Sequence, residues 1–126
     1  MKLKDALEKL PETQRECVMK CAEECDILDL EGDVEVGVDP RVLEFLKVLR
    51  NRVRLEILRL LKNRWLCVCL ISTILGREQT LISHHLKHLK KMGLVEERKI
   101  GRMRFYRTNL ESLRKHLGLI EEMFSS

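Results

Sequence analysis

The chain has 126 residues, of which 44% are apolar and 35% are charged. This length suffices for one small domain with a short appendage, but not for two hydrophobic cores. The longest apolar run, residues 65–71, is far shorter than the ~20 residues of a membrane span, and no secretory signal is expected at the charged N-terminus. We therefore expect a cytoplasmic protein without a membrane partner, whose five cysteines are reduced thiols.

The net charge of +4 conceals two halves of opposite sign. Residues 1–39 contain 5 Lys or Arg and 12 Asp or Glu, net −7, whereas residues 40–126 contain 19 and 8, net +11. An acidic arm joined to a basic domain favours a polyanionic partner for the basic part. The alternative is that the basic side chains only keep the surface solvated.

The predicted elements divide the chain into an acidic helical arm, residues 1–38, and a folded domain, residues 39–126. The arm begins with an amphipathic segment over 2–10 and ends in an acidic, glycine-punctuated loop over 31–39. In the domain, the expected order is a helix from Pro40, a helix after Asn51, a short helix over 70–75, a longer helix over 79–92, a hairpin over 95–106 and a helix over 110–124. This order predicts a mainly α fold with a β-hairpin wing, the winged helix-turn-helix.

The helix over 79–92 has the two faces that a DNA recognition helix needs. Its inner face carries Ile82, His85, Leu86 and Leu89, and its outer face offers hydroxyl, imidazole and ammonium groups to double-stranded operator DNA. The predicted DNA-binding side chains are Gln79, Thr80, Ser83, His84, Lys87 and Lys91 on this helix and Arg102 and Arg104 on the hairpin. A solvated helix and hairpin without DNA contacts is the alternative.

The histidines of this helix allow a second interpretation. His84 and His88 are four residues apart and could bind a metal ion, but no carboxylate or cysteine accompanies them on that face. Contact with solvent or DNA is therefore the expectation, and His85 is expected to be a hydrogen-bonded residue of the inner face.

Three stretches of the domain have specific residue patterns. They are the run 46–58 around Arg54, the Leu-Cys-Val-Cys step at 66–69, and the run 79–95 with its Ser-x-His-Leu-x-x-Leu pattern. Together they resemble the ArsR/SmtB family, whose members are dimeric, metal-sensing winged-helix repressors. The resemblance implies a homodimer built from the first and last helices of the domain, and release from operator DNA when a metal or metalloid binds. The family pattern is departed from at three places. Leu70 replaces an acidic residue, and Arg52-Val53 replaces the usual Pro-Thr before Arg54. Glu78 replaces a serine cap, which leaves Thr80 as the alternative cap.

Apolar residues on those two helices also predict a dimer, because they exceed what one small domain can bury. They are Val42, Leu43, Leu46, Leu113, Leu117, Ile120 and Phe124.

The cysteines are the predicted effector site. Cys67 and Cys69 lie two residues apart, so extended backbone would project both thiols to one side. As(III) or Sb(III) takes three thiolates, and Cd(II) or Zn(II) takes four, so further donors are needed. Cys17 and Cys21 are the favoured donors, as in relatives whose N-terminal arm contributes cysteines. Cys17, Cys21 and Cys25 could instead continue an apolar helix seam, or form a redox pair.

Other site types are not expected. Some relatives bind zinc on the last helix, but Asn109, Glu111 and His116 lack the required spacing. The sequence contains no recognisable set of catalytic residues and no glycine-rich phosphate-binding loop, so we expect neither an enzyme nor an organic cofactor. The alternatives to a metal sensor are a thiol redox switch on the same fold and a protein-interaction module.

Overall fold

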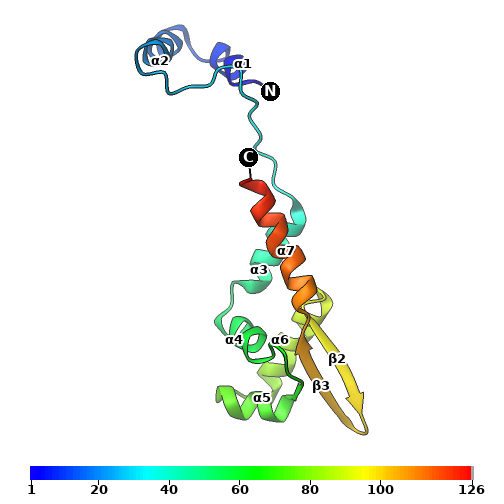
Figure 1. Ribbon diagram of the computed structural model, residues 1–126. Helices are drawn as coiled ribbons and strands as arrows, with labels where there is room; N and C mark the ends of the chain where they lie inside the picture. Colours follow the sequence, from blue (N-terminus) through cyan, green and yellow to red (C-terminus); the bar gives the residue numbers. More distant parts are fainter. Residues whose placement is uncertain (126) are drawn as a thin grey trace. The chain divides into compact units, whose positions relative to one another are not determined.

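The computed structural model describes residues 1–125 and divides the chain into two compact units, Met1–Gly37 and the part from Val38 onward. Each unit is described by itself. Figure 1 shows the helices and strands of both.

The first unit contains α1 (Leu3–Glu8) and α2 (Glu12–Cys25). The chain returns after α2, so that the backbone N–H of Leu3 donates to the carbonyl of Gly32 at 2.9 Å. An apolar pocket of about 210 Å³ lies between the two helices and the returning segment. Its lining residues are Leu3, Ala6, Leu7, Leu10, Val18, Leu28 and Leu30.

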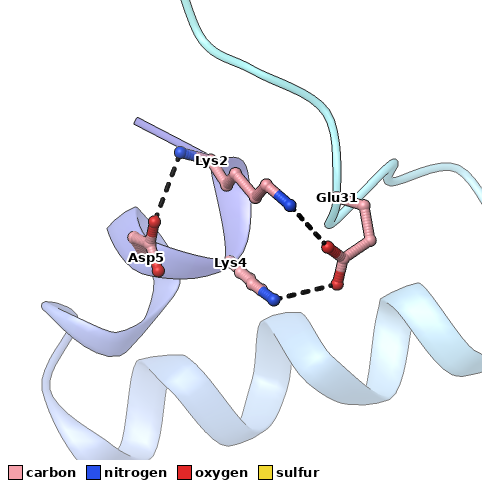
Figure 2. Close-up of polar contacts among 4 residues, drawn as sticks. All are labelled: Lys2, Lys4, Asp5 and Glu31. Carbon is pink, nitrogen blue, oxygen red and sulfur yellow. Dashed lines mark hydrogen bonds and ion pairs between the residues drawn. The ribbon is translucent and has the colours of Figure 1, made fainter.

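Salt bridges tie the start of α1 to the returning segment (Figure 2). The ammonium groups of Lys2 and Lys4 each lie 3.1 Å from an oxygen of the Glu31 carboxylate. The Glu31 pKa is lowered because Lys4, and then Lys2, donate to the carboxylate. Exposed pairs of this kind contribute little stability, so the apolar contacts carry most of the packing of this unit.

The cysteines of α2 do not belong to that apolar packing. Cys17, Cys21 and Cys25 are all exposed, whereas Val18 and Ala22 are half-buried. The interpretation that the three cysteines continue a packed apolar seam is therefore wrong, because the packed stripe of α2 lies one residue further along the helix.

The second unit is a winged helix-turn-helix, which confirms the predicted fold class. Its elements are α3 (Pro40–Leu49), α4 (Arg52–Leu60), β1 (Leu66–Cys67), α5 (Val68–Leu75), α6 (Gln79–Lys91), β2 (Val95–Ile100), β3 (Met103–Thr108) and α7 (Leu110–Met123). In Figure 1, β2 and β3 form a wing that extends from the helices, and α7 runs beside α3. Within residues 1–125, no helix is long and apolar enough to cross a membrane.

Local sequence signals explain where most of these helices begin and end. The Asp39 carboxylate caps α3 by accepting the Arg41 backbone N–H at 2.8 Å, and Asn51 caps α4. Gly76 ends α5 in the left-handed region, at φ 64°, where glycine avoids the steric cost of a Cβ.

Two expectations about helix starts are wrong. Thr80 is not a cap, because α6 begins at Gln79 after Glu78, whose side chain makes no capping hydrogen bond. Helix α5 begins at Val68 rather than at residue 70, and Cys67 occupies its N-cap position.

The sheet has three strands in the order β1-β3-β2, one more than predicted. Strand β1 pairs antiparallel with β3, which sets Leu66 opposite Tyr106 and Cys67 opposite Phe105. A strand of two residues is too short to show an alternating pattern, so the sequence gives no signal for it. Its effect is to attach the cysteine-bearing segment to the wing.

The base of the wing is fixed to α4. Thr108, at the end of β3, is 3% exposed, and its hydroxyl donates to the carbonyl of Leu58 at 2.7 Å. Its backbone N–H donates to the carbonyl of Leu61 at 3.1 Å. These buried bonds hold the wing against the helical core.

The core lies between the helices and the base of the wing. Its fully buried large side chains are Phe45, Ile57, Leu61, Ile71, Ile82, Leu86, Leu89 and Leu94. One apolar assignment is corrected: Val42, predicted at a dimer surface, is 3% exposed inside the unit.

Candidate functional site

Helix α6 has the two faces that its sequence predicts. Ile82, His85, Leu86 and Leu89 are 0%, 5%, 1% and 0% exposed, which confirms the inner face. All six predicted DNA-contacting side chains of this helix, Gln79, Thr80, Ser83, His84, Lys87 and Lys91, are exposed. The buried face packs against α5 and α4, so the outer face is held on a rigid support.

A hydrogen bond from α4 fixes the one polar residue of the inner face. The Nε of Arg54 donates to Nδ1 of His85 at 3.0 Å, and Nη1 of Arg54 donates to the carbonyl of Val48 at 3.3 Å. Burial, and then the charge of Arg54, lower the His85 pKa below 6.5. His85 is therefore a satisfied inner-face histidine that is neutral at pH 7.

The other two histidines of α6 form an edge-to-face pair on its outer face. The rings of His84 and His88 are 4.6 Å apart between centroids and lie nearly perpendicular. Partial desolvation by neighbouring side chains, and then the charges of Arg54 and other nearby groups, lower the His88 pKa. Lys87 and Lys91 contribute to that positive field, which opposes the binding of a metal cation at this pair.

The wing presents basic residues around its tip. Gly101, at φ 62°, makes the turn, and Arg98, Lys99 and Arg102 are exposed beside it. Within residues 1–125, none of these three forms an ion pair. They are thus available to an external anion.

Nearer the base, the wing's cations have carboxylate partners. Arg104, a predicted DNA contact, lies 3.0 Å from the Glu97 carboxylate, which also binds Lys90. The hydrogen bond from Lys90 is the main cause of the lowered Glu97 pKa. Arg107 pairs with Glu96 at 2.9 Å and lies over Trp65, 4.6 Å from the ring centroid.

The two cysteines of the domain occupy unlike positions. Cys67 is 6% exposed at the end of β1, whereas Cys69 is exposed within the first turn of α5. The expectation of extended backbone from 67 to 69 is wrong, because the chain becomes helical after Cys67. Their sulfurs therefore do not project side by side as in a strand.

Further metal donors are not gathered around this pair. Across residues 1–125, no group of three or more His, Cys, Asp or Glu side chains is arranged to hold a metal ion. Cys17 and Cys21 belong to the other unit. On the last helix, Asn109 caps α7, and the His116 ring stacks on Phe45 at 4.9 Å.

A helix with a basic outer face, supported by a second helix and followed by a basic hairpin, defines a winged-helix DNA-binding protein. Residues 51–97 match the family described as bacterial regulatory protein, arsR family. The chain belongs to the ArsR family of transcriptional regulators. It is a DNA-binding regulator and not an enzyme.

Three relatives show how far the similarity extends. An uncharacterised helix-turn-helix transcriptional regulator of Methanocaldococcus jannaschii is 38% identical, over 66% of this chain and 94% of the relative. The cadmium resistance regulatory protein CadC of Listeria innocua is 33% identical, over 71% and 76%. The arsenical resistance operon repressor of Staphylococcus aureus is 37% identical, over 60% and 75%.

Solved structures agree with the fold of the second unit. An ArsR-like transcriptional regulator from Rhodococcus sp. RHA1 superposes with a TM-score of 0.61 at 28% identity, covering 67% of this chain and 79% of its own. A homodimeric winged helix-turn-helix domain from Mycobacterium bovis superposes with a TM-score of 0.56 at 28% identity, covering 73% and 94%.

Proposed function

We propose that this protein is a homodimeric repressor that leaves operator DNA when a thiophilic metal or metalloid ion binds its cysteine thiolates. The observation that carries the proposal is the position of Cys67, whose strand pairs with the wing and whose neighbour Cys69 lies in the first turn of α5. The names of the cadmium and arsenical resistance relatives support the class of effector.

The dimer rests on apolar side chains that one unit does not bury. Leu43 and Leu46 on α3 are 57% and 47% exposed, and Leu117 on α7 is 49% exposed. Helices α3 and α7 pack together, so these side chains belong to one helix pair. The homodimeric neighbour from Mycobacterium bovis supports the same assembly. Two recognition helices would then lie about one DNA turn apart. A monomer in sedimentation at micromolar concentration would contradict this.

The proposed ligands are Cys67 and Cys69, with Cys17 and Cys21 as further donors. The pair alone offers two thiolates, fewer than As(III), Sb(III), Cd(II) or Zn(II) requires. Cys17 and Cys21 are exposed and four residues apart on α2, so both remain accessible to an ion. The bound ion would supply sulfur-metal bonds that link these thiolates, and it would displace their protons, so affinity should rise with pH.

The burial of Cys67 supports a route by which a bound ion would release the DNA. An ion reaches the exposed Cys69 directly, whereas ligation at Cys67 requires the end of β1 to shift from its place beside Phe105. Because β1 pairs with β3, such a shift changes the position of the wing. The effector would favour this altered state by its differential affinity, typically about 1–3 kcal/mol of coupling.

The test is operator release during titration of the protein–DNA complex with As(III), Cd(II) and Zn(II), for single Cys→Ser variants. Cys67→Ser and Cys69→Ser should bind DNA and lose release, and Cys17→Ser or Cys21→Ser should weaken release. Cys25→Ser is the matched control on the same helix and should respond like the wild type. Release at wild-type ion concentrations in both Cys67→Ser and Cys69→Ser would end the thiol-sensor proposal.

The same titration separates the two alternatives. Loss of DNA binding under oxidant without added ion, abolished by the same Cys→Ser variants, would favour a thiol redox switch. Binding of DNA that does not weaken with salt would favour a protein-interaction module, since phosphate contacts impose a strong salt dependence.

A further inference from the structure

A cleft of about 610 Å³ opens between the end of α3, the start of α4 and the end of α6. Its lining residues are Glu44, Lys47, Val48, Arg50, Asn51, Arg54, His88, Lys91 and Met92. Of the predicted DNA contacts, only Lys91 lines it. The cleft therefore lies mostly outside the recognition surface described above.

Four of the lining side chains are cations, and the cleft contains one carboxylate. Lys47, Arg50 and Lys91 are exposed, Arg54 is half-buried, and Glu44 is the acidic residue. In the part of the chain that the structure describes, none of the four cations forms an ion pair with any carboxylate, Glu44 included. The cleft thus has an uncompensated positive charge.

Arg54 is held in place in this cleft by neutral partners. Its Nε donates to His85 at 3.0 Å and its Nη1 donates to the Val48 carbonyl at 3.3 Å, while its backbone N–H donates to the Asn51 side chain at 3.2 Å. Its Nη2 has no hydrogen-bond partner among residues 1–125. A guanidinium that is fixed by neutral groups retains its charge and a donor for an external anion.

The positive charge of Arg54 contributes to lowered pKa values of the neighbouring His85 and His88. Desolvation is the first cause of the lowered pKa of both the buried His85 and the exposed His88, and the positive charge of Arg54 is the second. At neutral pH these rings therefore add no charge to the cleft, and Lys47, Arg50, Arg54 and Lys91 define its potential.

We propose that this cleft binds a phosphate group through Arg50, Arg54, Lys47 and Lys91. A phosphate is favoured because its several oxygens can accept from a fixed guanidinium and from ammonium groups at once. The group could come from the backbone of bound DNA or from a free phosphate or small phosphorylated molecule. The proposal does not depend on a thiol effector, since no cysteine lines the cleft.

The first experiment uses inorganic phosphate with the full-length protein. Amide and side-chain NMR resonances of Asn51, Arg54 and His88 should shift saturably with phosphate and not with chloride at the same ionic strength. Lys47→Ala and Arg50→Ala should each raise the dissociation constant about fivefold, as expected for loss of one exposed charge contact. Lys115→Ala on α7, which removes an equal charge elsewhere, should leave it unchanged.

The second experiment identifies the source of the phosphate. If DNA supplies it, Arg50→Ala should lower the slope of log K against log salt by about 0.9 for operator and random duplex alike, and saturating operator should abolish the phosphate-induced shifts. If a free molecule supplies it, the slope should stay unchanged and the shifts should persist on DNA. Thermal unfolding of each variant controls for folding. Absence of saturable shifts together with an unchanged salt slope would overturn the proposal.

Discussion

The Nε of Arg54 on α4 donates a hydrogen bond to Nδ1 of His85 on α6, at 3.0 Å. The bond requires Nδ1 to be unprotonated, so neutral His85 carries its proton on Nε2. Protonation of Nδ1 would replace this bond with a repulsion between two cations, one of them buried. The anchor between α4 and the recognition helix is therefore sensitive to pH.

The first prediction concerns this pH dependence. The folded-state pKa of His85 lies below its ordinary value of 6.5, so below about pH 6.5 the unfolded chain binds more protons than the folded chain. The free energy of unfolding should therefore decrease as pH falls below that value, with a slope of at most one proton from His85. His85→Asn, which keeps a short acceptor, should flatten the slope in urea unfolding between pH 5 and 7. An unchanged slope would show that His85 does not titrate in this way.

The second prediction concerns the outer face of α6. Lys87→Ala should weaken binding to operator and random DNA equally and reduce the salt slope by about 0.9, because lysine mainly contacts phosphate. Thr80→Ala or His84→Ala should instead change the preferred bases. Fluorescence anisotropy at several salt concentrations measures both effects. A Lys87→Ala protein with altered base preference and an intact slope would reverse these assignments.

The third prediction concerns Glu97, which neutralises Lys90 and Arg104 at the wing. Glu97→Gln removes one negative charge and frees Arg104, the predicted DNA contact, from its ion pair. Binding to DNA of any sequence should therefore tighten, and its salt slope should steepen by about 0.9, the value for one added phosphate contact. Glu96→Gln is the matched control, because Arg107 remains held over Trp65. Equal effects of the two substitutions would contradict the proposed role of Arg104.

The fourth prediction compares the two cysteines as packing groups. Cys67→Ser places a hydroxyl in a buried position and should cost about 1–3 kcal/mol of unfolding free energy if it finds no partner. Cys69→Ser changes an exposed side chain and should stay within about 0.5 kcal/mol. Urea unfolding of both variants measures the difference, and similar values would show that Cys67 is not packed.

Residue patterning was sufficient to predict the fold class and the faces of α6. The inner face of α6 follows from the 3.6-residue period of its apolar residues. The starts of α3 and α4 follow from Asp39 and Asn51, whose side chains cap these helices by accepting hydrogen bonds from backbone N–H groups of the first turn. These signals depend only on residues close together in the chain, so they can be recognised without knowledge of the tertiary contacts.

The features that the sequence did not predict depend on tertiary contacts. Strand β1 exists because β3 pairs with it, and that pairing buries Cys67. The ion pair of Arg104 with Glu97 depends on the hairpin register, which sets Glu97 opposite Tyr106, two residues from Arg104. A diagonal cross-strand pairing rule applied to the predicted hairpin would have found this pair.

Thr108 fixes the base of the wing, whereas the tip has no comparable buried hydrogen bonds within residues 1–125. Its buried bonds to Leu58 and Leu61 fix the end of β3, whereas the turn at Gly101 has exposed neighbours on both sides. Moving the base would break buried hydrogen bonds, but moving the tip only bends a two-stranded ribbon. If the wing contacts DNA as predicted, its tip would adjust to minor grooves of different width, while the fixed base would keep α6 in place.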